Sequence, residues 1–122
     1  MFTPTWEVEP TPAQNVAHFP AAALAENTSG IAVVCCRPRA DRSLDCEINT
    51  EWPEGNGFGA ATLRASSAYR LSPESTLDLE RRPDVRIRLS MIYAGMVVTD
   101  ETRNRLFTID AETIEACLAP AA

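Results

Sequence analysis

The stretch IAVVCCRPRADRSLDCEIN, residues 31–49, decides the fold because it holds two strand patterns separated by a short loop. Residues 31–37 are rich in Ala, Val and Cys, and residues 44–49 alternate strictly between apolar and polar side chains. A hairpin with a three-residue loop at residues 40–42 matches the two apolar faces, and a shift of two residues would preserve them. The opposed pairs in this register are Cys36 with Cys46, Val34 with Ile48, and Arg37 with Asp45.

The same register makes a prediction about the cysteines. Directly opposed residues of an antiparallel pair approach closely enough for a disulfide after a small backbone adjustment. We therefore predict a disulfide between Cys36 and Cys46 in an oxidising compartment. Cys35 points to the other face of the strand and is expected to be free.

Outside the hairpin, the pattern predicts helices before it, one packed helix after it and a third strand. One or two short helices are expected in the first 25 residues, where four Pro residues punctuate the first twenty positions and residues 16–25 supply apolar side chains. An apolar stripe of mostly small side chains over residues 58–71 predicts the packed helix, which Pro73 limits. Alternation over residues 85–93 predicts the third strand, with Arg86, Arg88 and Ser90 on its solvent face.

The charged stretch 72–83 is expected to be a solvated loop, with Glu74, Asp78 and Glu80 serving solubility. Residues 106–109 predict one more strand. Asp110 is a candidate N-cap of a closing helix that carries Ile114, Cys117 and Leu118. These elements together predict one α+β domain over residues 1–122, with an antiparallel sheet of about three strands.

The composition and charge of the chain exclude some classes of function. A net charge of −6 and a pI near 4.7 argue against a nucleic-acid partner, which requires a concentrated positive patch. No apolar run approaches the roughly 20 residues of a membrane helix. Residues 1–10 lack the basic and apolar regions of a secretory signal, so the protein is expected to be cytoplasmic if residues 1–122 are all of it.

The order of motifs resembles the C-terminal domain of TonB energy transducers over residues 6–93, with residues 94–122 as an extension. A Gly-Phe-Gly-Ala-Ala helix start and an aromatic-Arg-x-x-Pro exit carry much of the resemblance. The matching positions are Trp6, Pro10, Phe19, Pro20, Ala23, Gly30, residues 33–37, Asp41, residues 44–46, residues 57–61, Leu63 and residues 69–73.

This resemblance implies a fold of hairpin, helix and third strand, and a location in the periplasm or cell envelope. It implies that an extended segment of an outer-membrane receptor binds beside strand 85–93, where unpaired backbone groups accept a peptide. Arg86, Arg88 and Ser90 would then tune which peptide docks. Two copies of the chain pairing through a strand edge is a further expectation, and the extension is expected to cover the edge.

Catalysis, a cofactor and a metal are not expected. His18 is the only histidine and has no visible acidic partner, so no nucleophile can be assigned. Cys35 and Cys36 point to opposite faces, which disfavours their sharing one ion. The alternative to the interaction module is a cytosolic redox-responsive or metal-responsive protein that uses Cys35, Cys36 and Cys46.

Overall fold

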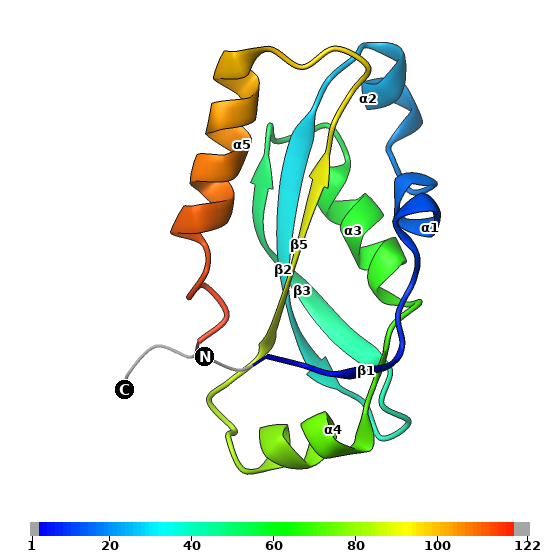
Figure 1. Ribbon diagram of the computed structural model, residues 1–122, viewed down its shortest axis with the longest axis vertical. Coiled ribbons are helices and arrows are strands. Elements are labelled where there is room, and N and C mark those ends of the chain that lie inside the picture. The colour runs from blue at the N-terminus through cyan, green and yellow to red at the C-terminus, as the bar shows by residue number, and fades with distance from the viewer. Residues whose placement is uncertain (1–2, 119–122) are drawn as a thin grey trace.

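A three-stranded antiparallel sheet forms the centre of the computed structural model, which describes residues 3–118 (Figure 1). The strands are β2 (Gly30–Pro38), β3 (Leu44–Trp52) and β5 (Ile87–Tyr93), in the order β3-β2-β5. Helix α3 (Phe58–Ser66) packs on one face, and helix α5 (Asp100–Glu112) covers the other face (Figure 1). The α+β class and the three-stranded antiparallel sheet are confirmed, with a second helix on the sheet.

The predicted hairpin register is confirmed, since Cys36 lies opposite Cys46 and Val34 opposite Ile48. The three-residue loop is closed by a hydrogen bond from Arg39 N–H to the Ser43 carbonyl, at 2.7 Å. Beyond Ile48 the register shifts by one residue, so that Val33 pairs with Thr50. This bulge places the Trp52 side chain on the α5 face of the sheet, because one extra residue reverses the alternation.

Strand β2 is buried on both faces, and each face belongs to a different core. Its residues Ala32, Val34 and Cys36 pack with Phe58 and the other buried residues of α3. Small side chains along α3 let the helix approach the sheet closely. On the other face, a smaller cluster consists of Ile31, Val33, Leu106 and Ile109, with Trp52 packed against it.

Two short helices precede the sheet as predicted, α1 (Pro12–Val16) and α2 (Ala21–Ala25). Thr11 caps α1: its hydroxyl accepts from Gln14 N–H, while the Gln14 side chain accepts from Thr11 N–H. A small second sheet pairs β1 (Trp6–Val8) with β4 (Arg70–Leu71) at the lower end of Figure 1. Strand β4 begins at Arg70, so the packed helix ends at Ser66 and does not continue to residue 71 as predicted.

The predicted loop at residues 72–83 is wrong, because helix α4 (Pro73–Glu80) occupies most of it. Glu74, Asp78 and Glu80 lie on this helix. Ser72 caps it by accepting from Ser75 N–H, and Pro73 takes a first-turn position that needs no N–H donor. Leu79 is fully buried and anchors the helix to the core.

The predicted strand at residues 106–109 is also wrong, because these residues belong to α5. Thr99 is the N-cap of that helix and accepts from Thr102 N–H, whereas Asp110 lies in the last turns. Leu106 and Ile109 are three positions apart and face the sheet together, which a helix achieves and a strand does not. After α5, residues 113–117 form turns, so no closing helix begins at Asp110.

Candidate functional site

The outer edge of β5 is the candidate site. Strand β2 occupies one side of β5, and Figure 1 shows β5 running along the molecule between α5 and α1. The N–H of Arg86 points outward, because it donates to the Cys117 carbonyl at 3.3 Å. Backbone groups alternate between the two sides of a strand, so those of Arg88, Ser90 and Ile92 also point outward. Outside the strand ladders, no backbone hydrogen bond within residues 3–118 has one of these three N–H groups as its donor.

A groove of about 390 Å³, here called the α1 groove, runs beside the upper half of this edge. Val16 and Phe19 form its outer wall, and residues 90–94 form its floor. Phe19 is held in place by edge-to-face contacts with Phe58 and Tyr93, whose ring centroids lie 6.0 and 5.5 Å away. The α1 groove is therefore a preformed and mainly apolar surface.

A second hollow of about 220 Å³, the α5 groove, lies on the other side of the same edge. Phe107, Leu106 and Val98 line it, together with Ile92. Ile92 also lines the α1 groove, so the two hollows meet at this residue. An extended chain added to β5 would place alternate side chains into the two grooves, because successive side chains point to opposite faces.

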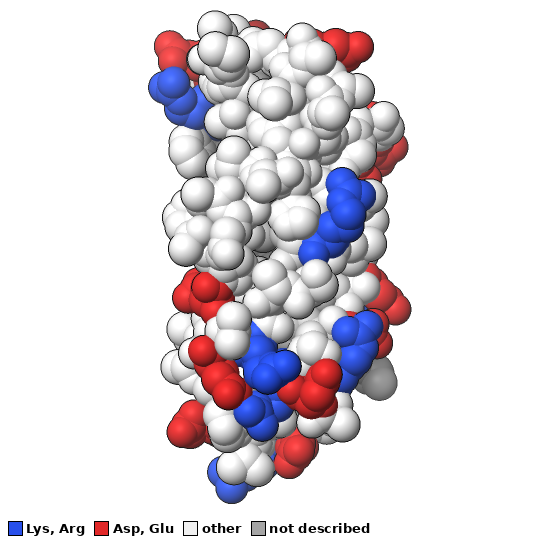
Figure 2. All heavy atoms as spheres, turned by 90° about the vertical axis from the view of Figure 1, so that its right-hand side faces the viewer, with Lys and Arg blue, Asp and Glu red and all other residues white. Residues whose placement is uncertain are grey.

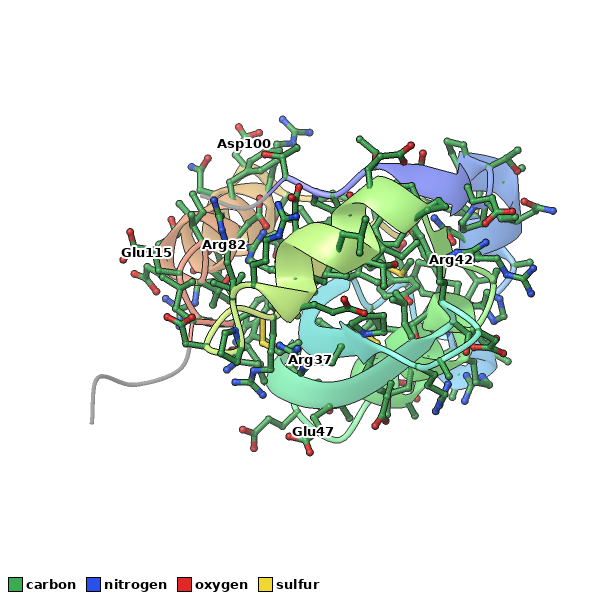
Figure 3. The ribbon with its side chains drawn as sticks, turned by 90° about the horizontal axis from the view of Figure 1, so that it is seen from below. Arg37, Arg42, Glu47, Arg82, Asp100 and Glu115 are labelled. Atoms are coloured by element: carbon green, nitrogen blue, oxygen red, sulfur yellow. A yellow bond between two sulfur atoms is a disulfide. The ribbon has the colours of Figure 1, made fainter. Side chains whose placement is uncertain are left out.

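The surface around the upper end of β5 is mainly apolar, although the charged residue Arg103 also lines the α5 groove. Val16, Ile92 and Phe107 are respectively 64%, 40% and 57% exposed. Figure 2, which shows the side of the molecule that carries α1 and α2, has few charges across its middle and gathers both signs toward the lower end. Figure 3 shows that lower end, with Arg37, Arg42, Glu47 and Arg82 around the base of the sheet.

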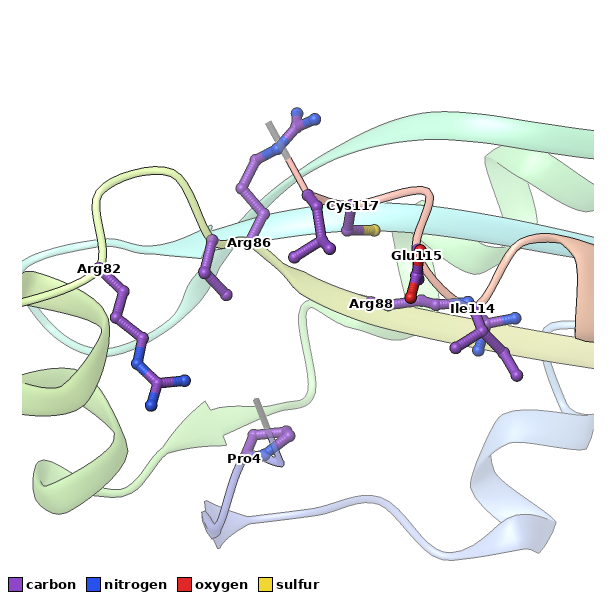
Figure 4. Close-up of a pocket in the computed structure, with 9 residues that line it drawn as sticks. Pro4, Arg82, Arg86, Arg88, Ile114, Glu115 and Cys117 are labelled. Atoms are coloured by element: carbon purple, nitrogen blue, oxygen red, sulfur yellow. The ribbon is translucent and has the colours of Figure 1, made fainter. Parts of the chain in front are cut away.

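A third hollow, the arginine pocket, lies where β5 begins and measures about 370 Å³ (Figure 4). Arg82 reaches toward it from the loop before β5, while the Arg86 side chain points to the opposite side of the ribbon. Ile114, Cys117 and Leu118 close it from the C-terminal segment. This segment pairs with the chain just before β5 through a bridge between Val85 and Leu118. A fourth hollow of about 640 Å³, beside Trp52, does not involve β5.

The predicted site residues Arg88 and Ser90 lie on β5, but their side chains do not face solvent. The Arg88 guanidinium donates to Asp110 Oδ1 at 2.8 Å and to the Thr113 carbonyl at 2.7 Å. Ser90 Oγ donates to the same Asp110 Oδ1 at 2.6 Å. The alternation placed both residues on the correct face, but α5 covers that face, so they anchor the helix. Arg86 is half-buried, with Nη1 at 3.9 Å from Glu47 Oε2.

The environment of Asp110 has opposing effects on its pKa. Partial burial raises the pKa, whereas the hydrogen bonds from Ser90 and Arg88 and the Arg88 charge lower it, and the net direction is downward. Asp110 is therefore ionised at neutral pH and accepts hydrogen bonds from Arg88 and Ser90 of β5.

Cys36 and Cys46 are joined by a disulfide across the hairpin, with their Cα atoms 4.1 Å apart. The expectation that Cys35 is free is wrong, because Cys35 is bonded to Cys117. Cys35 does point to the other face, as predicted, and the C-terminal segment carries Cys117 to that face. The two bonds leave no free thiol among the described cysteines, which are all four of the chain.

Other features of the described chain bear on function. Residues 3–118 contain no helix long and apolar enough to cross a membrane. They also contain no cluster of three His, Cys, Asp or Glu side chains arranged to hold a metal ion. No protein-family model matches the chain, and comparisons with curated proteins and with solved structures give no significant match.

Apart from Ser90, which lines the α1 groove, sequence reasoning missed the residues that line the two grooves. Two weak signals were present. Ile92 is apolar at a position where the alternation of the strand predicts a polar side chain, and Phe107 is apolar within a mostly polar stretch. An exposed apolar side chain at such a position is informative when it joins others in one patch.

Proposed function

We propose that this chain is a non-enzymatic protein-interaction module that binds an extended peptide as a fourth strand on the outer edge of β5. The observation that carries the proposal is the row of outward backbone groups at Arg88, Ser90 and Ile92, flanked by the α1 and α5 grooves. Main-chain hydrogen bonds would supply affinity, and the grooves would select the side chains.

The peptide class follows from the grooves. Because they lie on the two sides of β5 and meet at Ile92, two consecutive apolar residues of the peptide would each occupy one groove. The neutral middle of the surface in Figure 2 favours an uncharged segment at this level. The net charge of −6 disfavours nucleic acid as the partner.

The resemblance to the TonB C-terminal domain suggests a segment of an outer-membrane receptor as the partner, with the domain in the cell envelope and engaged in transport. Two disulfides in one small domain support an oxidising compartment such as the periplasm. The alternative of a cysteine-based redox protein is supported by the adjacent Cys35 and Cys36, which belong to different disulfides.

A displayed library of random decapeptides, selected against the oxidised full chain, tests the proposal. The selected peptide is then made synthetically and titrated against Ser90→Pro and Ser90→Ala variants. The Pro variant loses the outward N–H, whereas the Ala variant keeps it and loses only the hydroxyl bond to Asp110. We expect about a tenfold or greater loss of affinity in the Pro variant relative to the Ala variant, about the value of one hydrogen bond.

Equal affinities of the two variants would rule out strand addition at this edge. Protection of the Arg88, Ser90 and Ile92 amides from hydrogen exchange in the complex is the matching structural readout. Sedimentation of the free chain tests whether a second copy of the chain, and not a peptide, pairs with the edge of β5. A dimer that dissociates on Ser90→Pro substitution would identify the second copy.

A further inference from the structure

The C-terminal segment that follows α5 occupies the first part of the edge to which we assign peptide binding. Cys117 accepts a hydrogen bond from the outward N–H of Arg86, and Leu118 forms an antiparallel bridge with Val85. These are contacts of the kind that an added strand makes. The segment therefore shortens the free edge, which begins only at Arg88.

Little besides one covalent bond holds this segment against the sheet. Ile114 and Leu118 are respectively 47% and 48% exposed, so their burial contributes little. The N–H groups of Ile114, Ala116 and Leu118 bond to carbonyls at residues 111–115, within the segment and the end of α5. Beyond Thr113, attachment to the strands rests on the Arg86 bond, on the bridge between Val85 and Leu118, and on Cys117, which is buried and bonded to Cys35.

The two disulfides differ in what they restrain. The Cys36–Cys46 bond joins strands that a ladder of paired residues already holds in register. The Cys35–Cys117 bond links residues 82 apart in sequence and joins the C-terminal segment to the central strand. Cys117 also lines the arginine pocket, a hollow of about 370 Å³, while Cys35 and Cys117 are each 3% exposed, so a reductant reaches the bond when this pocket opens further.

We propose that the Cys35–Cys117 disulfide is a redox gate on the outer edge of β5. A dithiol reductant would attack the bond as a thiolate and pass two electrons and two protons to it. The products are two cysteine thiols in this chain and a disulfide in the reductant. Residues 114–118 then leave the edge, and the Arg86 N–H joins those of Arg88, Ser90 and Ile92 in the free row. The consequence for peptide binding rests on the function proposed above, whereas the release of Arg86 does not.

Amide hydrogen exchange in the full chain tests the gate without a peptide. In a Cys36→Ser, Cys46→Ser variant, only the Cys35–Cys117 bond responds to dithiothreitol. We expect reduction to speed exchange at Arg86 about tenfold or more, while Val34 in the central strand stays protected. The matched Cys35→Ser, Cys117→Ser variant should exchange quickly at Arg86 with or without reductant.

Two results would overturn the gate. Unchanged protection of Arg86 after reduction would show that the segment stays in place, and simultaneous loss of protection at Val34 would show global unfolding. Titration of the selected decapeptide forms a separate arm, in which we expect several-fold tighter binding after reduction. Faster exchange at Arg86 without any decapeptide binding would support the gate and refute peptide capture at this edge.

Discussion

At the scale of single residues, Gly30 shows how closely the helix and sheet are packed. A Cβ atom at this position would collide with the ring of Phe58 and lie 2.7 Å from the Trp52 carbonyl oxygen. We expect Gly30→Ala to lower the free energy of unfolding by about 1–3 kcal/mol, the usual effect of overpacking, as measured by urea denaturation.

Gly59→Ala is the matched control for that substitution. Its Cβ atom would meet Ile48 Cδ1 at 2.8 Å and Glu51 Oε2 at 2.9 Å, which are the ends of flexible side chains that can move aside. Alanine also favours the helix that Gly59 occupies, by about 1 kcal/mol. We expect Gly59→Ala to stay close to wild type, and equal losses in both variants would contradict the packing of Phe58 on β2.

Asp110 makes the attachment of α5 depend on pH. The pKa of Asp110 is lower in the folded protein than in the unfolded chain, so its stabilising effect is present above about pH 4. The effect is lost as the pH falls through the lower, folded-state pKa. We expect Asp110→Asn to flatten the rise in unfolding free energy between pH 2 and 5, measured by urea denaturation at each pH. Asp78→Asn, on the exposed side of α4, should leave the curve parallel to wild type.

At the scale of elements, the register of the hairpin between its loop and Ile48 was predictable, whereas the bulge beyond Ile48 and the later helices were not. Residues 44–49 alternate strictly between apolar and polar side chains, and a slip by one against strand 31–37 would reverse their faces. Helices α4 and α5 hold few apolar residues, so their patterns are weak. The signal for α5 lay elsewhere: β2 is apolar at Ile31 and Val33 as well as at Ala32 and Val34, which indicates a strand covered on both faces.

Ser72 is the N-cap of α4 and is expected to contribute to the stability of the fold. Its hydroxyl accepts from Ser75 N–H at 3.2 Å, and the residue is buried next to Thr5. We expect Ser72→Ala to cost about 1 kcal/mol of unfolding free energy, the usual value of an N-cap. Ser67→Ala removes an exposed hydroxyl at the end of α3 and should cost less; equal costs would show that the cap contributes nothing.

Substitutions at two neighbouring residues of α5 are expected to affect different properties, one the stability of the fold and the other peptide binding. Leu106 is buried in the small core with Ile31 and Val33, whereas Phe107 is exposed in the α5 groove. We expect Leu106→Ala to lower the unfolding free energy by about 2–5 kcal/mol. Phe107→Ala should leave stability nearly unchanged and weaken the selected decapeptide severalfold, measured by calorimetric titration. Wild-type affinity in the Phe107 variant would remove the α5 groove from the site.

At the scale of the whole molecule, the site depends on segments that are distant in sequence. The edge of β5 is flanked by α1 near the N-terminus and by α5 near the C-terminus. Strand alternation identified β5 and the faces of its side chains, but it contains no information on which distant helix covers each face. For that reason, Arg88 and Ser90 were expected in solvent and instead bind Asp110.

The Cys35–Cys117 bond also determines how the chain would respond to mechanical force. A pull between the two ends would pass from β2 directly to Cys117, and the loop that spans the sequence separation of 82 between the bonded cysteines would carry no tension. At about 3.3–3.6 Å for each extended residue, this loop holds roughly 280 Å of contour length, which can extend only when the bond is reduced and the domain then unfolds under load. In an optical-tweezers experiment, unfolding of the oxidised chain would therefore give a short extension, and unfolding of the reduced chain would add the length of this loop.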